Sequence, residues 1–313
     1  MVTSWRWPSG LIHALKVVER GGRECTLHFA PSWVEVRQGS PDGRPAVQCR
    51  FALGTFHEYG VDSRDPAGIA CEAQVGDLLA ALRSAWGFLK SGGAREATEP
   101  QAFRMVLSKK GRTPILRVKV RRFVGEPDSV RMVHDVPVTL LAAGSLPAAD
   151  LLAGGRGGGG RGGGVRLRVP AGALARLRDF TLSAREVSKE LSVLAKRDAR
   201  GRVLLALGAE ADSVRVISRI TLARPLPRDH GEEDDCGEDD DSGEEDGDVG
   251  QAEVSVKLMQ LAHVLALQGV DGQAAVVRIS ETSLLLVFDL GSGVGGSHPA
   301  KLAYCVHAVD SGV

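Results

Sequence analysis

Basic side chains recur in the four segments of the sequence that have the apolar periodicity of helices. They lie beside or opposite the apolar stripe: Lys16 and Arg20 in the first segment, Arg83 and Lys90 in the second, Arg176 and Arg178 in the third, and Lys257 and His263 in the fourth. Cations on helix faces bind phosphate oxygens and hold DNA without reading its bases. Each residue alone would also suit a solvated helix surface. Their occurrence in all four segments makes a surface that faces the DNA backbone as well supported as a plain solvated surface.

A glycine-rich segment, Gly291–Gly296, matches the G-x-G-x-x-G pattern of phosphate-binding loops. That use requires a helix directly after the glycines, because the helix amides and dipole meet the phosphate. The residues that follow, 302–308, have the pattern of a strand, so a hairpin loop is favoured over a dinucleotide site. A nucleotide-dependent enzyme that uses this loop is the alternative from another functional class.

Other residue patterns typical of catalysis do not occur in the sequence. His134 and Asp135 are neighbours on an expected strand, where adjacent side chains point to opposite faces. There is no serine elbow, no H-E-x-x-H motif and no carboxylate pair, and the acidic run lacks the ordered ligand spacing of a calcium loop. The sequence therefore predicts a protein without catalytic residues, bound metal or cofactor.

Charge is divided between a basic body and one acidic segment. Lys and Arg number 39, as do Asp and Glu, so the formal net charge is +0. The segment Asp229–Asp248 contains 13 acidic residues and no Lys or Arg, so the rest of the chain has a surplus of 13 positive charges. Such a surplus favours a polyanionic partner. The acidic run itself is expected to be a solvated, disordered loop, which could also screen basic surface or dock a basic partner.

Composition also bears on where the protein works. No apolar run approaches the roughly 20 residues that cross a bilayer, and the first eight residues lack the apolar core of a secretory signal. The five cysteines are scattered without a C-x-x-C pair: Cys25, Cys49, Cys71, Cys236 and Cys305. We expect a soluble intracellular protein with reduced, mostly buried thiols and no membrane partner.

The chain contains two halves with a similar order of elements. Helices are expected at 10–20 and 75–89, and again at 171–181 and 257–267. The expected strands are 25–29, 33–37, 47–53, 103–108, 115–121 and 130–136, followed by 188–195, 202–207, 213–222, 253–256, 275–280, 284–290 and 302–308. A repeated order indicates internal duplication. The predicted fold class is α+β, with two similar domains that each have two helices on antiparallel sheets.

Domain limits follow from composition. We expect an N-terminal domain at 1–141, a connector at 142–164 and a C-terminal domain at 165–313, with an acidic disordered loop at 229–250. The connector includes Gly154–Gly164, which is nine glycines and two arginines and has little to bury. Arginine–glycine segments can bind RNA, but with two arginines a linker is favoured.

Several segments resemble one protein family. The closest are VRMVHDVPVTLL at 130–141, with its His-Asp-hydrophobic-Pro signature, and AEVSVKLMQLAHVLALQ at 252–268. The runs 25–31 and 284–290 also fit. Together with the duplicated plan they resemble the PCNA-like sliding clamps, and among these the family of the Hus-one subunit of the nine-one-one DNA-damage checkpoint clamp. The first ten residues, with two Trp and a Pro, depart from that family's first strand.

The resemblance implies a non-catalytic subunit of a heterotrimeric ring built with two paralogous clamp subunits. A clamp loader would place the ring on double-stranded DNA in the nucleus, without sequence preference, and the ring would recruit checkpoint and repair proteins. A homotrimeric replicative clamp is the alternative within the same fold.

Under this plan, a ring subunit must offer an unpaired strand edge to each neighbour. Alternating charges commonly protect such edges from indiscriminate pairing. The segment 115–121 has charges at alternate positions, so we expect a subunit-interface edge at Ile115, Arg117, Lys119 and Arg121.

Overall fold

The computed structural model describes residues 2–5, 8–39, 46–91, 103–123, 129–142, 151–152, 165–197, 202–211, 214–222, 251–265, 274–290 and 300–309. The chain divides into two compact units. Unit 1 is Met1–Gly158 with Val287–Cys305, and unit 2 is Gly159–Leu286 with Val306–Val313. The Gly/Arg tract, the acidic loop and the G-x-G-x-x-G segment lie outside the described residues, and the domain limits expected from composition stay a prediction.

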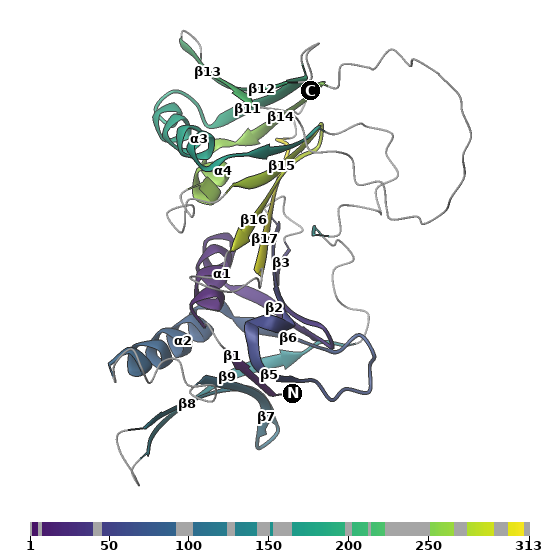
Figure 1. The fold of residues 1–313 in the computed structure, drawn as a ribbon, viewed down its shortest axis with the longest axis vertical. Coiled ribbons are helices and arrows are strands. Elements are labelled where there is room, and N and C mark those ends of the chain that lie inside the picture. Colours follow the sequence, from purple (N-terminus) through teal and green to yellow (C-terminus); the bar gives the residue numbers. More distant parts are fainter. Residues whose placement is uncertain are drawn as a thin grey trace, which may run out of the picture. The chain divides into compact units, whose positions relative to one another are not determined.

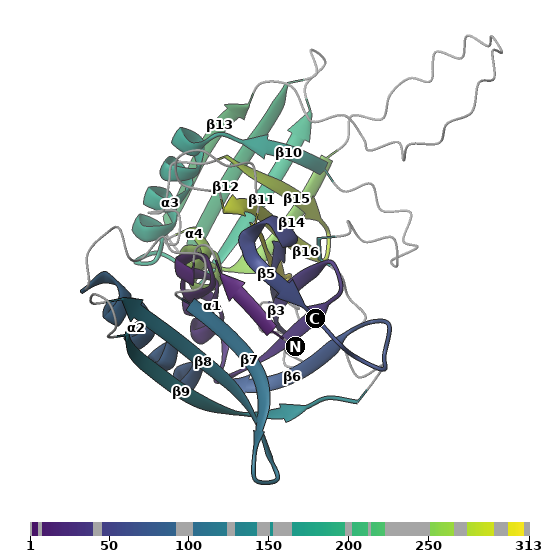
Figure 2. The ribbon, with the colours of Figure 1, turned by 60° about the horizontal axis from the view of Figure 1, so that its bottom comes forward.

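Unit 1 is built from antiparallel strands and two helices (Figure 1). In chain order its elements are β1 (Val2–Trp5), α1 (Pro8–Gly21), β2 (Glu24–Ala30), β3 (Trp33–Gln38), β4 (Ala46–Ala52), the 3-10 helix η1 (Leu53–Thr55), β5 (Phe56–Gly60), β6 (Ile69–Gln74), α2 (Val75–Lys90), β7 (Phe103–Lys110), β8 (Thr113–Phe123) and β9 (Ser129–Leu140). The order within the sheet is β4-β3-β2-β6-β9-β8-β7-β1-β5. Helices α1 and α2 contact each other, with α1 on β3 and β4 and α2 on β6, β8 and β9, as Figure 2 shows for α2.

Unit 2 repeats this order. Its elements are β10 (Val165–Val169), α3 (Ala171–Ala184), β11 (Glu190–Arg197), β12 (Val203–Ala211), β13 (Val214–Leu222), β14 (Gln251–Lys257), α4 (Leu258–Leu265) and β15 (Ala275–Ser280). Strands β16 (Ser283–Leu290) and β17 (Ala300–His307) give residues to both units. The four-stranded antiparallel sheet has the order β13-β12-β11-β14, and α3 contacts α4. Apart from η1 and β5, each element of the first half has a counterpart in the second, which confirms the duplicated α+β plan.

The helices form where apolar residues recur at helical spacing. Leu11, Leu15 and Val18 are buried on one stripe of α1, and Leu78 and Leu82 are buried on one stripe of α2. Both helices lie where the periodicity predicts them. Their apolar stripes pack against the sheet, so the polar faces of the same helices are left to solvent.

A pair of glycines, Gly21 and Gly22, lies at the end of α1. The Gly22 amide donates to the Val18 carbonyl at 3.2 Å, and the buried side chain of Gln38 lies where a Cβ on Gly21 or Gly22 would be. The Gln38 amide then donates to the Glu24 carbonyl at 3.2 Å. The glycines leave room for the Gln38 side chain, which would have to shift if either carried a Cβ.

Four strands have no counterpart among the sequence-based expectations: β1, β5, β6 and β10. In β6 the buried residues are Cys71 and Ala73, whose small side chains give a weak apolar alternation. The first ten residues do contain a first strand, because β1 pairs with β5 and β7. Strand β10 does have a clear local pattern, because Val165, Leu167 and Val169 alternate with arginines and are buried. The strands β1, β5 and β6 are placed by long-range pairing that local pattern does not report.

Strand β8 is not an edge strand, so the expected unpaired edge at 115–121 is wrong. It pairs along its length with β7 on one side and with β9 on the other. Its charges alternate because one face of β8 points outward, where Lys119 and Arg121 are exposed. Arg117 donates from Nε to Oδ1 of Asp135 on β9 at 2.7 Å, and this hydrogen bond lowers the pKa of the Asp135 carboxyl.

Four described cysteines, Cys25, Cys49, Cys71 and Cys305, are buried thiols, as expected. Burial raises the pKa of the Cys25 and Cys71 thiols to about 12. These thiols are therefore protonated and unreactive at neutral pH.

A buried carboxylate joins β3 to β4 in unit 1. Glu35 has 0% exposure, and its Oε2 accepts from Gln48 Nε2 and from Arg50 Nε, each at 2.9 Å. Arg37 forms an ion pair with the other oxygen of Glu35. The Gln48 Oε1 accepts from the Leu151 amide at 2.6 Å, so this cluster also fixes the chain after β9.

Aromatic rings extend the cluster. The Arg50 guanidinium lies 4.4 Å from the centre of the Trp33 ring, and His28 packs edge-on against Trp33 at 4.7 Å. Burial lowers the pKa of His28, and the two nearby arginines lower it further. His28 is thus neutral at physiological pH, and its Nε2 donates to the Ala67 carbonyl at 2.8 Å.

We predict that Glu35→Ala lowers the free energy of unfolding by about 3 kcal/mol, because it leaves two largely buried guanidinium groups without their counter-charge. Urea unfolding followed by circular dichroism measures this change. The matched control is Glu58→Ala, which removes an exposed carboxylate paired with Arg104 and should cost less than about 1 kcal/mol. Equal losses in the two variants would contradict the structural role of Glu35.

Candidate nucleic-acid interface and open sheet edges

Three of the predicted DNA-facing residues lie on the contacting helices of unit 1. Lys16 and Arg20 are one turn apart on α1, and both are exposed. Arg83 is exposed on α2 and forms an ion pair with Glu19 of α1 at 3.6 Å. The cations therefore share their surface with at least one carboxylate, which partly neutralises it.

Unit 2 carries the next three predicted residues. Arg176 is exposed on α3 and Arg178 is half-buried there, with its Nε 3.4 Å from Asp179 Oδ1. Lys257 is exposed, but it is the last residue of β14 and not the first turn of a helix, because α4 begins at Leu258. Its side chain points outward in the alternation of the strand. The expectation that Lys257 lies on a helix is therefore wrong.

The side chains of Lys90 and His263 lie outside the described residues. The remaining six predicted residues lie on or next to α1, α2, α3 and α4. Exposed cations on helix surfaces suit loose, sequence-independent contact with phosphates. A role in DNA binding stays a prediction for each of them.

Among the backbone edges that are unpaired within the described part of the chain are those of β13 and of part of β9; β5, β10 and β14 are also outermost strands of their sheets. Strand β13 pairs with β12 alone and forms one side of its sheet. On β9, residues 138–140 pair with β6, whereas 129–137 pair with β8 only. Unpaired N–H and C=O groups in a row can bind another strand.

The duplication shows how such edges can be used. Strand β4 is the counterpart of β13, and β17 is the counterpart of β9. Within unit 1, β4 and β17 pair from Ala300↔Phe51 to Cys305↔Ala46. The bridge between Val256 and Ala308 in the second half corresponds to the pair Ala73 and Val138 in the first half. Ala308 of the second half is therefore equivalent to Val138 of the first. Counting back along both strands, residues 300–305 of β17 are equivalent to residues 130–135 of β9. The edges of β9 and β13 are thus equivalent to the two edges that pair where β17 meets β4. Within the described structure, neither β9 nor β13 has the corresponding strand beside it.

Side chains at both edges are incompletely covered. On β13, Ile220 and Leu222 are buried, but Val216 and Ser218 on the same face are only half-buried. On β9 burial also falls from Val136 to Met132, and Nε2 of the intervening His134 is buried with no hydrogen-bond partner within the described structure.

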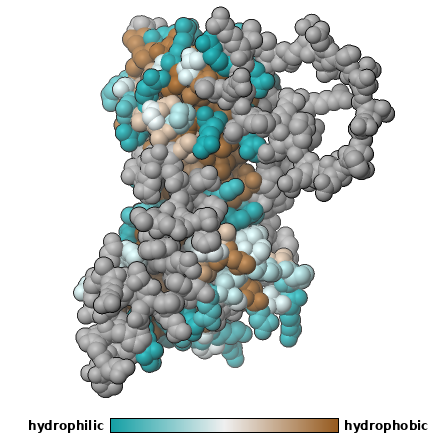
Figure 3. Space-filling model, viewed as in Figure 1, coloured by the Kyte–Doolittle hydropathy of each residue, from teal (hydrophilic) through white to brown (hydrophobic). Residues whose placement is uncertain are grey.

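Exposed apolar residues mark the same two strands. Val133 on β9 and Val214 and Ile217 on β13 are large apolar side chains that reach solvent. Figure 3 shows apolar surface at the top of the view, over the region where β12 and β13 are labelled in Figure 1. Neither edge was identified from the sequence. The irregular alternation of apolar and polar residues along 214–219 is a signal that could have pointed to β13.

The described residues also bear on whether the chain holds a metal site or a membrane-spanning helix. Among those residues no group of three or more His, Cys, Asp or Glu is arranged to hold a metal ion. No helix there is long and apolar enough to cross a membrane.

Comparison with known proteins identifies both fold and family. The structure matches PCNA from Thermococcus kodakaraensis at TM-score 0.62 and 15% identity, covering 98% of this chain and 99% of that chain. It matches A. fulgidus PCNA, solved with the C-terminal region of FEN-1 bound, at TM-score 0.60 and 13% identity, covering 99% and 100%. It matches the PCNA2–PCNA3 complex from Sulfolobus tokodaii at TM-score 0.57 and 13% identity, covering 98% and 99%.

No curated protein sequence gives a significant match to this chain. A family model described as Hus1-like protein matches residues 9–310, which confirms the resemblance inferred from the sequence. The structural matches confirm the predicted fold class. The chain belongs to the Hus1-like protein family and is a clamp subunit with the PCNA-like sliding-clamp fold.

Proposed function

We propose that this protein is one subunit of a heterotrimeric checkpoint clamp that encircles double-stranded DNA. In this role it has no catalytic activity of its own and works in the nucleus, where the ring carries checkpoint and repair proteins along DNA after a clamp loader has placed it there. The observation that carries the proposal is the pair of open edges on β9 and β13, in a chain that belongs to the Hus1-like family.

The open edges support head-to-tail assembly. Residues 130–135 of β9 correspond to the part of β17 that pairs with β4, and β13 corresponds to β4. If β9 of one subunit pairs with the β13 counterpart of the next, each junction repeats the internal one. Such heterologous contacts close into a ring when the rotation between subunits allows it. In a heterotrimer, the β9 and β13 edges of this chain would meet two different paralogues.

We predict that Ile217→Glu and Val133→Glu each weaken binding to one paralogous subunit by about fivefold or more, because a carboxylate is then placed beside the incoming strand. Pairwise titration of this chain with each paralogue, followed by fluorescence anisotropy, measures the two dissociation constants.

The control for both is Leu182→Glu on α3. Leu182 is 47% exposed, against 45% for Ile217 and 52% for Val133, so all three variants should fold. The edge assignment fails if the control weakens assembly as much as the edge variants, or if neither edge variant affects either partner.

The helix cations support the DNA-encircling part of the proposal. Lys16, Arg83 and Arg176 are exposed on α1, α2 and α3, where they can contact phosphates without reading bases. Loose electrostatic contact of this kind permits sliding, and its strength depends on salt.

We predict that replacing Lys16, Arg83 and Arg176 together with Gln weakens retention of the assembled ring on DNA. The slope of log K against log salt concentration should fall by about 0.9 for each phosphate that the helices no longer neutralise. The control replaces Arg64, Lys109 and Arg112 with Gln, which removes the same charge from exposed positions away from the helices. Equal slopes for the helix variant and the unaltered ring would contradict contact through these helices.

A further inference from the structure

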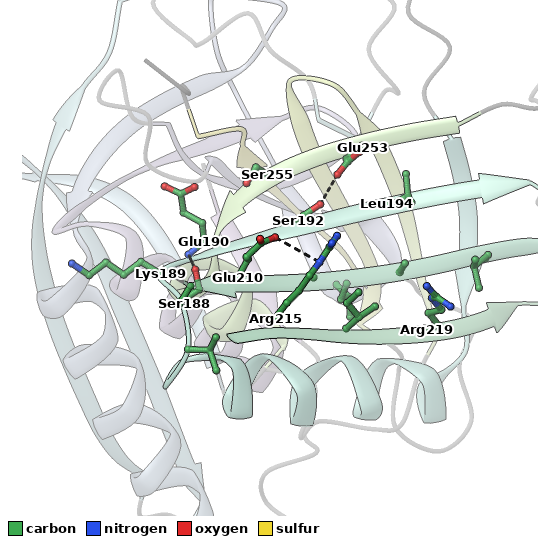
Figure 4. Close-up of a pocket in the computed structure, with 17 residues that line it drawn as sticks. Ser188, Lys189, Glu190, Ser192, Leu194, Glu210, Arg215, Arg219, Glu253 and Ser255 are labelled. Carbon is green, nitrogen blue, oxygen red and sulfur yellow. Dashed lines mark hydrogen bonds and ion pairs between the residues drawn. The ribbon is translucent and has the colours of Figure 1, made fainter. Parts of the chain in front are cut away.

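The outer face of the four-stranded sheet in unit 2 is a shallow hollow of about 700 Å³ (Figure 4). Successive side chains of each strand point alternately to this outer face and to the face that packs on the helices. Leu191 and Val193 are buried on the helix side, whereas Ser192, Ala206 and Gly208 form part of the floor of the hollow. These small side chains leave the sheet surface open.

Charges on this face are divided along the strands. At one end, the exposed Glu190 lies next to the exposed Lys189 along the chain, and the exposed Glu210 forms an ion pair with Arg215 at 3.6 Å, so the charges there balance. Figure 4 shows this pair and, apart from it along β13, Arg219. Nearer the middle, Glu253 accepts a hydrogen bond from Ser192 at 2.6 Å.

The opposite end carries cations. We define the basic end of the sheet as Lys196 and Arg219, which lie on this face, together with Arg197, which ends the same strand as Lys196 and is paired with the buried Val203, so that it follows the opposite face. All three are exposed, and none has an ion-pair partner among the described residues. Lys196 and Arg219 lie on the same outward face, since Lys196 is opposite Leu204 and Arg219 is opposite Ala206 on the strand between them.

The two ends of the acidic segment are attached at this basic end. Strand β13 ends at Leu222, opposite Val203, and β14 begins at Gln251, directly opposite Lys196. Asp248 is three residues before Gln251, so chain geometry keeps its Cα within roughly 10 Å of that of Gln251. Facing residues of paired strands are about 5 Å apart. The last residue of the acidic run, Asp248, therefore lies within roughly 15 Å of Lys196.

We propose that the acidic segment Asp229–Asp248 of this chain occupies the basic end of the sheet. Its 13 carboxylates are tethered on both sides, so their effective concentration at the basic end is on the order of millimolar. Docked there, the segment keeps other polyanions, nucleic acid included, away from the face opposite α3 and α4.

This arrangement would explain why the chain combines a basic body with one strongly acidic segment. The basic end would otherwise compete with the helices for phosphate, because non-specific binding depends on exposed cations wherever they lie. An acidic segment at the basic end leaves the helix cations available. The inference does not require the ring, because both the segment and its site are in unit 2.

The test uses a fluorescent peptide with the sequence of residues 229–248, under reducing conditions at low salt. It is titrated against the intact chain and against a variant in which a Gly/Ser linker of the same length replaces these residues. The peptide should bind the linker variant, and bind the intact chain at least about tenfold more weakly because the tethered copy holds the site. Higher salt should weaken both interactions.

The site is tested in the linker variant by replacing Lys196, Arg197 and Arg219 with Gln, which should abolish peptide binding. The control replaces Arg168, Arg176 and Arg185, which are also exposed in unit 2, and should leave binding unchanged. Equal binding to the intact and linker chains would overturn the proposal, as would equal loss in the two triple variants. It would also be overturned if a DNA oligonucleotide, but not the peptide, bound the basic end of the linker variant.

Discussion

Backbone pairing at strand edges is the constraint on which the rest of this structure depends. Each half of the chain builds its strands in the same order, so each half creates the same kind of edge. One edge is satisfied internally, where β17 pairs with β4. The equivalent edges, on β13 and on residues 129–137 of β9, have no strand beside them in the described structure. Assembly is therefore the natural completion of a fold whose internal repeat is paired at only one of two equivalent places.

Charged side chains are distributed unevenly over the helix and sheet faces of the same fold. The helices pack their apolar stripes on the sheets, so α1, α2 and α3 present Lys16, Arg83 and Arg176 outward. The sheet face opposite α3 and α4 has cations as well, and the segment with 13 carboxylates that we propose as their occupant leads into β14, which begins opposite Lys196. The two faces of unit 2 thus differ in how much positive charge they offer to a polyanion.

The sequence predicts what is local and strongly periodic. The buried stripes of α1 and α2, the duplicated order and the clamp family follow from residue pattern and resemblance. Strands such as β6 were missed because their buried residues are small. The open edge was misplaced on β8 because alternating charge tells which face of a strand is outward, and says nothing about which side is paired. Arg117, for example, faces Asp135 of the neighbouring strand. Edges depend on long-range register, and the β9 and β13 edges were therefore found only from the pairings.

The most direct test of the central claim is the light-scattering mass of the purified chain, alone and after co-expression with two paralogous clamp subunits from the same organism. The account predicts a monomer when the chain is alone, because its two open edges are meant for different neighbours. It predicts a complex with one copy of each subunit after co-expression. A stable homotrimer would contradict the account and indicate a replicative clamp. A chain that stays monomeric with every paralogue would contradict ring assembly itself.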